Sequence, residues 1–238
     1  MKDTQPTGPP AGLQKVGEAL ASLPPEFEIP AADTPPGRIL RAAREIVAEQ
    51  GLEDLTMRAV AGRAEVNLAL IHYYFGSKEK LVHATIRSEI LATQRDVFGI
   101  LDSNLDVPAL FIQFPVSIVE VMRRDPIRVR LLRRVLGSSP ERLSRAIGEL
   151  GTHGLLGASR VLLDMIARAQ AAGQLPAMEA RSILLHMLAS AYGLVMVEPV
   201  AHALLGFSLQ DQDLWRDHRA NLERLLRDGL CAEEGKEN

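Results

Sequence analysis

The stretch from Asn67 to Leu81 reads NLALIHYYFGSKEKL and joins a short apolar run to a cluster of aromatic residues. The chain holds one Trp, three Tyr and six Phe, yet three of these ten stand side by side at Tyr73, Tyr74 and Phe75. Asn67 suits an N-cap because its side-chain oxygen can accept a hydrogen bond from a first-turn N–H. Gly76 interrupts the run, and a new helix can start after Ser77. The stretch therefore predicts a helix of about two turns followed directly by a longer one.

Two amphipathic segments precede this stretch. Apolar residues recur at helical spacing from residue 38 to residue 50, and Gly51 fits the C-terminal cap of that helix. Thr56 offers an N-cap hydroxyl to a second helix, within TMRAVAGRA, and three turn residues (64–66) separate it from Asn67. Two short helices joined by such a turn form a helix-turn-helix, whose second helix can enter a DNA major groove about 12 Å wide.

The remaining chain also favours helices, so the predicted fold class is all-α. From residue 106 onward the apolar residues follow helical periodicity without strand alternation. Proline in a first helical turn costs no hydrogen bond. Helices are accordingly expected to begin at Pro108, Pro126, Pro140, Pro176 and near Gln210.

Composition limits the possible classes of protein. The formal net charge of −3 argues against a wholly basic nucleic-acid coat but leaves room for a small DNA-reading surface. The N-terminus lacks the pattern of a secretory signal, and a single cysteine suits a reducing cytosol, so we expect a cytoplasmic protein. The most apolar segment, residues 183–197, is short for a bilayer span of about 20 residues, which predicts a helix buried in protein and no membrane partner.

Three segments, RILRAAREIVAEQG, LTMRAVAGRAEV and LALIHYYFGSKEKL, together resemble the N-terminal domain of the tetracycline-repressor (TetR) family of regulators. The resemblance covers residues 38–87. It implies an all-helical homodimer with a three-helix DNA-binding domain, a linking helix and a larger domain that holds an effector pocket and the dimer interface. It also implies a repressor that a small-molecule effector releases from a pseudo-palindromic double-stranded DNA operator.

This resemblance divides the chain into four parts. Residues 1–37 hold eight of the 14 prolines and are expected to form a flexible arm. Residues 38–87 are the expected helix-turn-helix DNA-binding domain, and residues 88–230 the expected effector-binding and dimerisation domain. Residues 231–238 form a polar C-terminal tail.

The residues expected at the DNA fall into two groups. Matched to the family's outward face, the residues expected to choose the base sequence are Asn67, Leu68, Ala69 and His72. The residues expected to contact phosphates are Thr56, Arg58, Tyr73 and Lys78. Two alternatives stay open: Asn67 serves only as a cap, and His72, where the family usually has tyrosine, takes a core or phosphate role.

Two further expectations concern how the short second helix is held. A helix of about two turns is marginal alone, so Ile71, Tyr74 and Phe75 are expected to anchor it to the core. Glu65 occupies a turn position where the family usually has glycine, so the turn is expected to be strained or altered.

The larger domain offers only low-specificity signals. The candidate effector pocket comprises Phe111, Phe114, Met122, Met165, His186, Met187, Tyr192 and Met196. The candidate dimer interface comprises Leu184, Leu188, Leu214, His218, Leu222 and Leu225. For both groups the alternative is ordinary core. The arginine-rich segment 123–134 either binds an anion or is a solvated or internally paired helix face.

No motif of an enzyme is found. The sequence contains no HExxH, no GxSxG, no P-loop and no Cys/His metal spacing, so no catalysis, cofactor or metal is expected. The alternative function is a helical protein-binding adaptor or ligand-binding protein without sequence-specific DNA binding.

Overall fold

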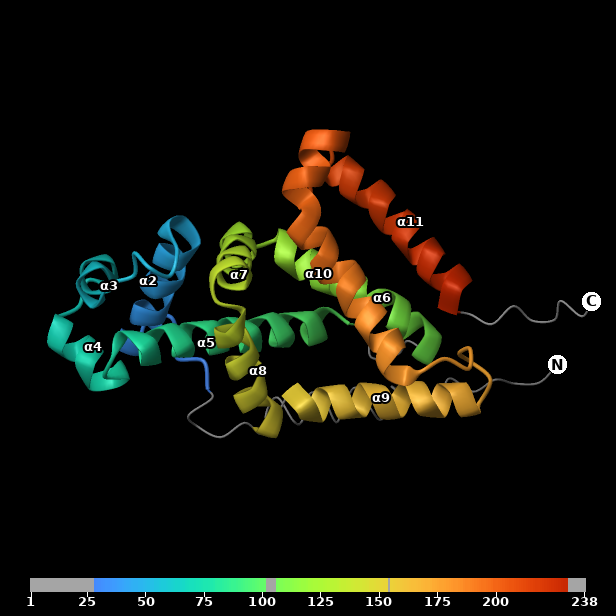
Figure 1. Ribbon diagram of the computed structural model, residues 1–238, viewed down its shortest axis with the longest axis horizontal. Coiled ribbons are helices and arrows are strands. Elements are labelled where there is room, and N and C mark those ends of the chain that lie inside the picture. The colour runs from blue at the N-terminus through green and yellow to red at the C-terminus, as the bar shows by residue number, and fades with distance from the viewer. Residues whose placement is uncertain (1–27, 102–105, 154, 231–238) are drawn as a thin grey trace, which may run out of the picture. The chain divides into compact units, whose positions relative to one another are not determined.

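The computed structural model describes residues 28–101, 106–153 and 155–230, and all regular structure within these ranges is helical. The all-α prediction is confirmed. Figure 1 labels the helices: α2 (Pro35–Gln50), α3 (Met57–Ala64), α4 (Leu68–Phe75), α5 (Lys78–Ile100), α6 (Val107–Arg123), α7 (Pro126–Ser138), α8 (Pro140–His153), α9 (Leu155–Ala171), α10 (Ala180–Leu205) and α11 (Gln212–Leu230).

The expected helix starts hold with one exception. Pro126 and Pro140 are the first residues of their helices, and Pro108 is the second residue of α6. Pro176 instead precedes α10, which begins at Ala180 because Glu179 caps it by accepting a hydrogen bond from the Ser182 N–H at 2.6 Å. The expected arm and tail mostly lie outside the described residues, although Pro35 already belongs to α2.

The chain forms two compact units. The head unit contains the described residues between 28 and 95 and between 124 and 156, and the body unit contains those between 96 and 123 and from 157 to 230. This division differs from the expected boundary after residue 87. Helices α7 and α8 belong to the same unit as the helix-turn-helix, so the expected DNA-binding domain has more supporting helices than its three-helix pattern suggested.

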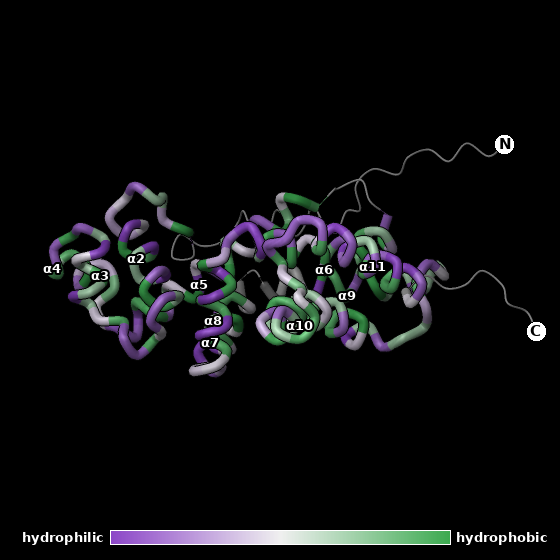
Figure 2. Tube along the Cα trace, turned by 90° about the horizontal axis from the view of Figure 1, so that it is seen from above, coloured by the Kyte–Doolittle hydropathy of each residue, from purple (hydrophilic) through white to green (hydrophobic). Residues whose placement is uncertain are grey.

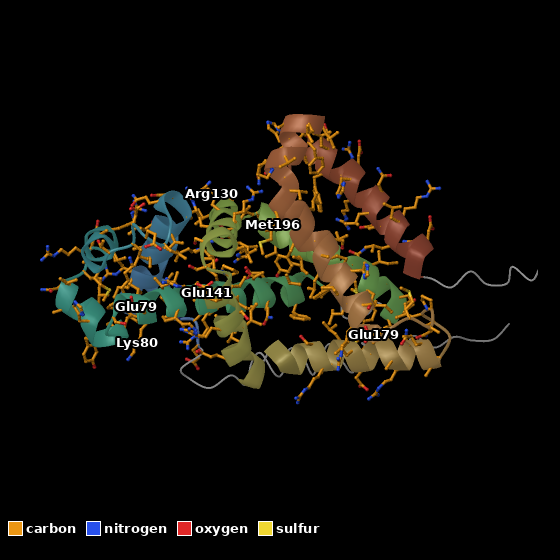
Figure 3. The ribbon with its side chains drawn as sticks, in the orientation of Figure 1. Glu79, Lys80, Arg130, Glu141, Glu179 and Met196 are labelled. Atoms are coloured by element: carbon orange, nitrogen blue, oxygen red, sulfur yellow. The ribbon has the colours of Figure 1, made fainter. Side chains whose placement is uncertain are left out.

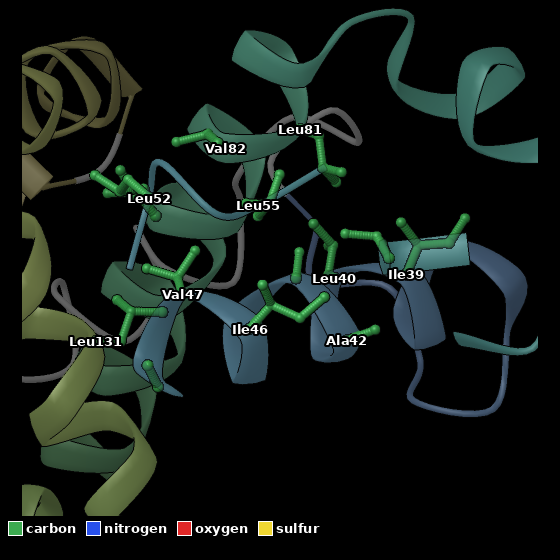
Figure 4. Close-up of a cluster of buried hydrophobic side chains, with 14 of the residues drawn as sticks. Ile39, Leu40, Ala42, Ile46, Val47, Leu52, Leu55, Leu81, Val82 and Leu131 are labelled. Atoms are coloured by element: carbon green, nitrogen blue, oxygen red, sulfur yellow. The ribbon is translucent and has the colours of Figure 1, made fainter. Parts of the chain in front are cut away.

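The core of the head unit is built around α2. Ile39 and Ile46 are completely or almost completely buried, and Leu55 and Leu81 join them from the segments before α3 and within α5. Figure 4 shows Leu131 of α7 in the same cluster. Burying such side chains stabilises the unit by roughly 1.5–3 kcal/mol each, which holds helices far apart in sequence together.

The start of α2 depends on a close backbone approach. Thr34 caps the helix, and its hydroxyl also donates to the Ala31 carbonyl at 2.6 Å. A Cβ atom added at Gly37 would lie 2.0 Å from the Ala31 oxygen, which is backbone and cannot swing away. Only glycine therefore fits at this position of α2.

In the body unit, α10 and α11 both pack against α6. Helix α10 carries apolar side chains on several sides. It buries only a narrow stripe of them, at Ile183, Met187, Ala191 and Val195. Figure 2 shows this helix as predominantly hydrophobic. By length and composition alone, α10 is the one helix among the described residues that could cross a membrane, and only 22% of its most apolar stretch is buried.

Candidate nucleic-acid interface

The helix-turn-helix begins and turns as the sequence predicted. The Thr56 hydroxyl caps α3 by accepting from the Ala59 N–H at 3.1 Å. Helix α3 ends at Ala64 and is followed by the C-cap residue Glu65, whose φ of 52° and ψ of 48° are left-handed. Glu65 is the only non-glycine residue with positive φ in the described ranges. Of the two expected alternatives, a strained or an altered turn, the structure shows the first, because the chain keeps the left-handed geometry without the glycine that suits it.

Helix α4 is set by a cap at each end. The Asn67 side-chain oxygen accepts from the Ala69 N–H at 2.8 Å, which confirms Asn67 as an N-cap. At the other end, Gly76 has φ 73°, and its N–H donates to the His72 carbonyl at 3.0 Å. Ile71 is completely buried, and Leu68 and Phe75 pack against the same core. The three residues recur at intervals of three and four, so one side of α4 is fixed to the head unit.

The opposite side of α4 faces solvent. Ala69, His72 and Tyr73 are exposed there at helical spacing, and the Tyr73 side chain is 80% exposed. Two expectations differ from the structure. Leu68 is half-buried against the core and does not belong to the outward face. Tyr74 is 43% exposed and does not anchor the helix; its ring contacts Tyr73 edge-on, with centroids 5.1 Å apart.

Polar and basic groups flank the outward side of α4. Thr56 and Arg58 are exposed at the start of α3. Lys78 opens α5, and its ammonium group donates to the Glu53 carbonyl at 3.0 Å. Figure 3 labels Lys80 on the first turn of α5, where it is exposed, whereas Lys78 is half-buried. The sequence pattern singled out Lys78 and missed Lys80, although the first-turn spacing of the two lysines was a usable signal.

A network of charged side chains fixes α7 to α2 and α5. The Arg44 Nε of α2 lies 2.7 Å from the Glu89 carboxylate of α5, and Arg44 also pairs with Asp125. Arg128 of α7 lies 3.6 Å from Glu89. Asp125 additionally caps α7 by accepting from two backbone N–H groups. The network thus ties three helices of the head unit to one another.

Burial acts on both acids of this network. It raises the pKa of the Glu89 carboxyl, an effect that the guanidinium groups of Arg44 and Arg128 oppose. At Asp125 burial acts in the same direction, but the hydrogen bond from the Arg128 N–H and the charge of Arg44 outweigh it and lower the pKa of that carboxyl.

The arginine-rich segment 123–134 is substantially paired within the protein. In the body unit, Arg123 contacts Glu120 at 3.2 Å and the Leu209 carbonyl at 3.1 Å. In the head unit, Arg128 is buried with Glu89, and Arg134 donates to the Glu49 carbonyl at 3.4 Å. For these residues the pairing interpretation of the sequence fits the structure. Arg130 is exposed (Figure 3).

The candidate effector-pocket residues separate into three groups by burial. Those buried in the body unit are Phe111, Phe114, Met122, Met165 and Met187, and those half-buried are Tyr192 and Met196. His186 differs from the expectation because it is exposed, with its Nδ1 atom 2.7 Å from the Ser182 carbonyl. It lies one residue off the narrow buried stripe of α10, which includes Met187.

The candidate dimer residues occupy α10 and α11 but include only part of the exposed apolar surface. Leu184, Leu188, His218 and Leu222 are half-buried, whereas Leu214 and Leu225 are 39% and 71% exposed. Burial lowers the pKa of the His218 imidazole, whose ring lies 5.2 Å from that of Phe207. The sequence pattern missed further exposed residues, namely Leu185, Val197, Val200, Leu204 and Leu205. An uninterrupted apolar sequence does not reveal which of its faces is covered.

Known proteins resemble the chain at two levels. Residues 39–85 match the model of the family described as bacterial regulatory proteins, tetR family. The HTH-type transcriptional regulator BetI of Rhizobium meliloti is 47% identical over 58 residues, which are 24% of this chain and 28% of that protein. BetI of Agrobacterium fabrum is 38% identical over 63 residues, or 31% of its length. The chain thus spans less than a third of these relatives.

Solved structures extend the resemblance of fold to most of the chain. A tetR family transcription regulator from Shewanella has a TM-score of 0.61 and 17% identity over 84% of this chain and all of that one. The fatty acid degradation regulator FadR from Bacillus halodurans has a TM-score of 0.64 and 14% identity over 83% of this chain and 96% of that one. At such identities the likeness concerns the fold alone.

These findings define a class of helical proteins that carry an N-terminal helix-turn-helix. Residues 39–85 match the TetR family of bacterial regulatory proteins in sequence, and the larger part of the chain is similar to solved members of this class in fold alone.

Proposed function

We propose that the chain is a transcriptional regulator that binds double-stranded DNA through the outward side of α4. The observation that carries this proposal is the two-sided character of this helix. Ile71 is completely buried, whereas the Tyr73 side chain on the other side is 80% exposed. A protein gains nothing in stability by exposing an aromatic side chain, so its position beside α3 and α5 favours a role in binding.

The charges around α4 suit a small DNA-reading surface. Exposed Arg58 and the lysines at the start of α5 supply positive charge on either side of the helix. Such contacts orient a protein on the phosphate backbone, while side chains on the helix meet base edges. The Thr56 hydroxyl and those first-turn amides of α3 and α5 that the Thr56 and Ser77 caps do not occupy supply further donors for phosphate oxygens.

We further propose that the protein acts as a homodimer in the cytoplasm. The apolar surface of α10 and α11 is available for a second copy, and two heads would then meet half-sites about 34–36 Å apart on a pseudo-palindromic operator. Repression and release by a small molecule bound in the body unit follow from the family resemblance. Such release requires a coupling of only about 1–3 kcal/mol between the two sites.

A selection from random DNA with the purified full chain tests this function. We expect one enriched, pseudo-palindromic sequence, whose binding weakens at least about tenfold between about 50 and 200 mM salt. Tyr73→Phe removes one hydroxyl without shortening the side chain and should weaken binding about three- to tenfold. Arg168→Ala is the matched control because it alters an exposed ion pair of α9 in the body unit.

The outcomes of the selection distinguish the proposed DNA-binding function from the proposed phosphate contact of Tyr73. Failure to enrich any sequence would contradict the proposed function and favour the adaptor alternative. Normal enrichment with unchanged affinity of Tyr73→Phe would refute only the phosphate contact of Tyr73. Thermal unfolding of each variant should match the parent chain, since Tyr73 contributes no buried surface to the core.

A further inference from the structure

Two side chains of the α4 region make hydrogen bonds within the protein, and these bonds determine whether the remaining group of each side chain is a donor or an acceptor. Of the residues exposed there, Ala69 has no polar side-chain atom, and Tyr73 lies near the C-terminal end of the helix. The polar side chains that remain are His72 in the middle of the helix and Asn67 at its start. Each already uses one of its groups in a hydrogen bond.

His72 is held by the turn that ends α4. Its Nδ1 atom lies 3.0 Å from the Gly76 carbonyl oxygen. A carbonyl oxygen can only accept a hydrogen bond, so this contact selects the tautomer in which Nδ1 carries the proton and Nε2 is the acceptor. The Gly76 N–H also donates to the His72 carbonyl, and the φ of 73° at Gly76 suits glycine. The same turn therefore selects the tautomer of the ring.

Asn67 has the opposite polarity. Its side-chain oxygen accepts from the Ala69 N–H at 2.8 Å, so the group left for a partner is the amide NH₂, a donor. Asn67 and His72 are five residues apart, a rise of about 7.5 Å along a helix. Five residues also correspond to a rotation of about 140° around the helix axis. Because the two side chains leave the helix in different directions and at different heights, we assign them to different base pairs.

We propose that His72 reads an amino base, adenine or cytosine, through Nε2, and that Asn67 rejects cytosine at a separate base pair. In the major groove adenine offers its N6 amino group and cytosine its N4 amino group, whereas guanine and thymine present no donor. A donor such as the Asn67 amide finds an acceptor on every base except cytosine. The inference rests on the proposed binding of α4 to DNA and specifies which bases it selects.

The test compares the operators selected by three forms of the full chain from one random DNA library. The parent chain should select adenine or cytosine over guanine and thymine at one position of each half-site, by about three- to tenfold. His72→Arg replaces an acceptor by donors and should convert that position to guanine. Asn67→Asp keeps a cap of equal quality but lacks the donor, so cytosine should become acceptable at a different position.

Asn67→Ser is the structural control, because serine retains the cap and cannot reproduce the amide. Its thermal unfolding should match that of the parent chain. One operator position should change its base when His72 is replaced by Arg. If the parent chain selects guanine or thymine at that position, the inference is overturned. A substitution that lowers affinity without changing any base preference would also overturn it. Absence of an enriched sequence for the parent chain would overturn the proposed function itself, and the two failures are therefore distinguishable.

Discussion

At the scale of single residues, backbone conformation explains the most unusual feature of the head unit. Glu65 sits in the left-handed region, and its N–H reaches the Ala61 and Gly62 carbonyls that end α3. This conformation costs a residue with a Cβ atom roughly 1–2 kcal/mol. The turn retains it because the cores of α3 and α4 must meet at one angle, with Ala64 and Ile71 both buried. Tertiary packing outweighs local preference at this position.

Glu65→Gly should therefore stabilise the protein by about 1 kcal/mol, because glycine adopts the left-handed conformation without steric cost. Denaturant unfolding followed by circular dichroism measures the shift. Glu65→Ala is the matched control, since alanine removes the charge and keeps the strain. An equal gain from both variants would show that the charge, and not the backbone, is responsible.

At the scale of helices, α7 behaves as part of the head unit. Leu131 and Val135 lie in the core around α2, and the ion pairs of Arg44, Glu89 and Arg128 add polar contacts to the same packing. The side chains of these three residues are between 9% and 18% exposed, so water screens their charges poorly. Removing one member leaves the remaining buried charges with fewer partners, which costs more than the loss of an ion pair at the surface.

Glu89→Gln should lower the free energy of unfolding by on the order of 2 kcal/mol, because two arginines lose a shared carboxylate. Asp164→Asn provides the comparison. Asp164 pairs with Arg168 at 2.7 Å in α9, but both side chains are more than half exposed. Asp164→Asn should lower the free energy of unfolding by less than about 0.5 kcal/mol. Urea unfolding of both variants checks the contrast, and equal effects would mean that the head-unit network is as weak as a surface pair.

At the scale of the whole molecule, the exposed apolar surface of α10 and α11 is where we propose that a second copy of the chain binds. Leu204 and Leu205 are 76% and 80% exposed, and Leu225 of α11 is 71% exposed. Large apolar surfaces on a protein mark sites of association. Within one chain only a narrow stripe of α10 is buried in the core. The other sides of the helix are therefore available for the proposed contact.

Leu204→Glu should convert the dimer to a monomer, because a carboxylate cannot be buried in an apolar interface without a large cost. Light scattering coupled to size-exclusion chromatography measures the mass, and circular dichroism should show unchanged helix content. Ile147→Glu, an equivalent change on α8, should leave the mass unchanged. A parent chain that is monomeric at micromolar concentration, or a dimer that persists in Leu204→Glu, would contradict this interface.

The sequence alone was enough to predict the helix ends of the helix-turn-helix in the head unit. Apolar spacing and cap chemistry are local properties, so Thr56, Asn67, Gly51 and Ser77 could be placed at helix ends without knowledge of the fold. The exposure of Tyr73 followed in the same way from its spacing relative to buried Ile71.

Only the tertiary structure decided which surfaces are covered. Leu68 packs inward and Tyr74 faces solvent because the neighbours of α4 come from elsewhere in the chain. In the same way, α7 joins the head unit through residues more than 80 positions from α2, such as Asp125 against Arg44. Helical periodicity states which side chains share a face, but the identity of the partner on that face depends on contacts between distant segments.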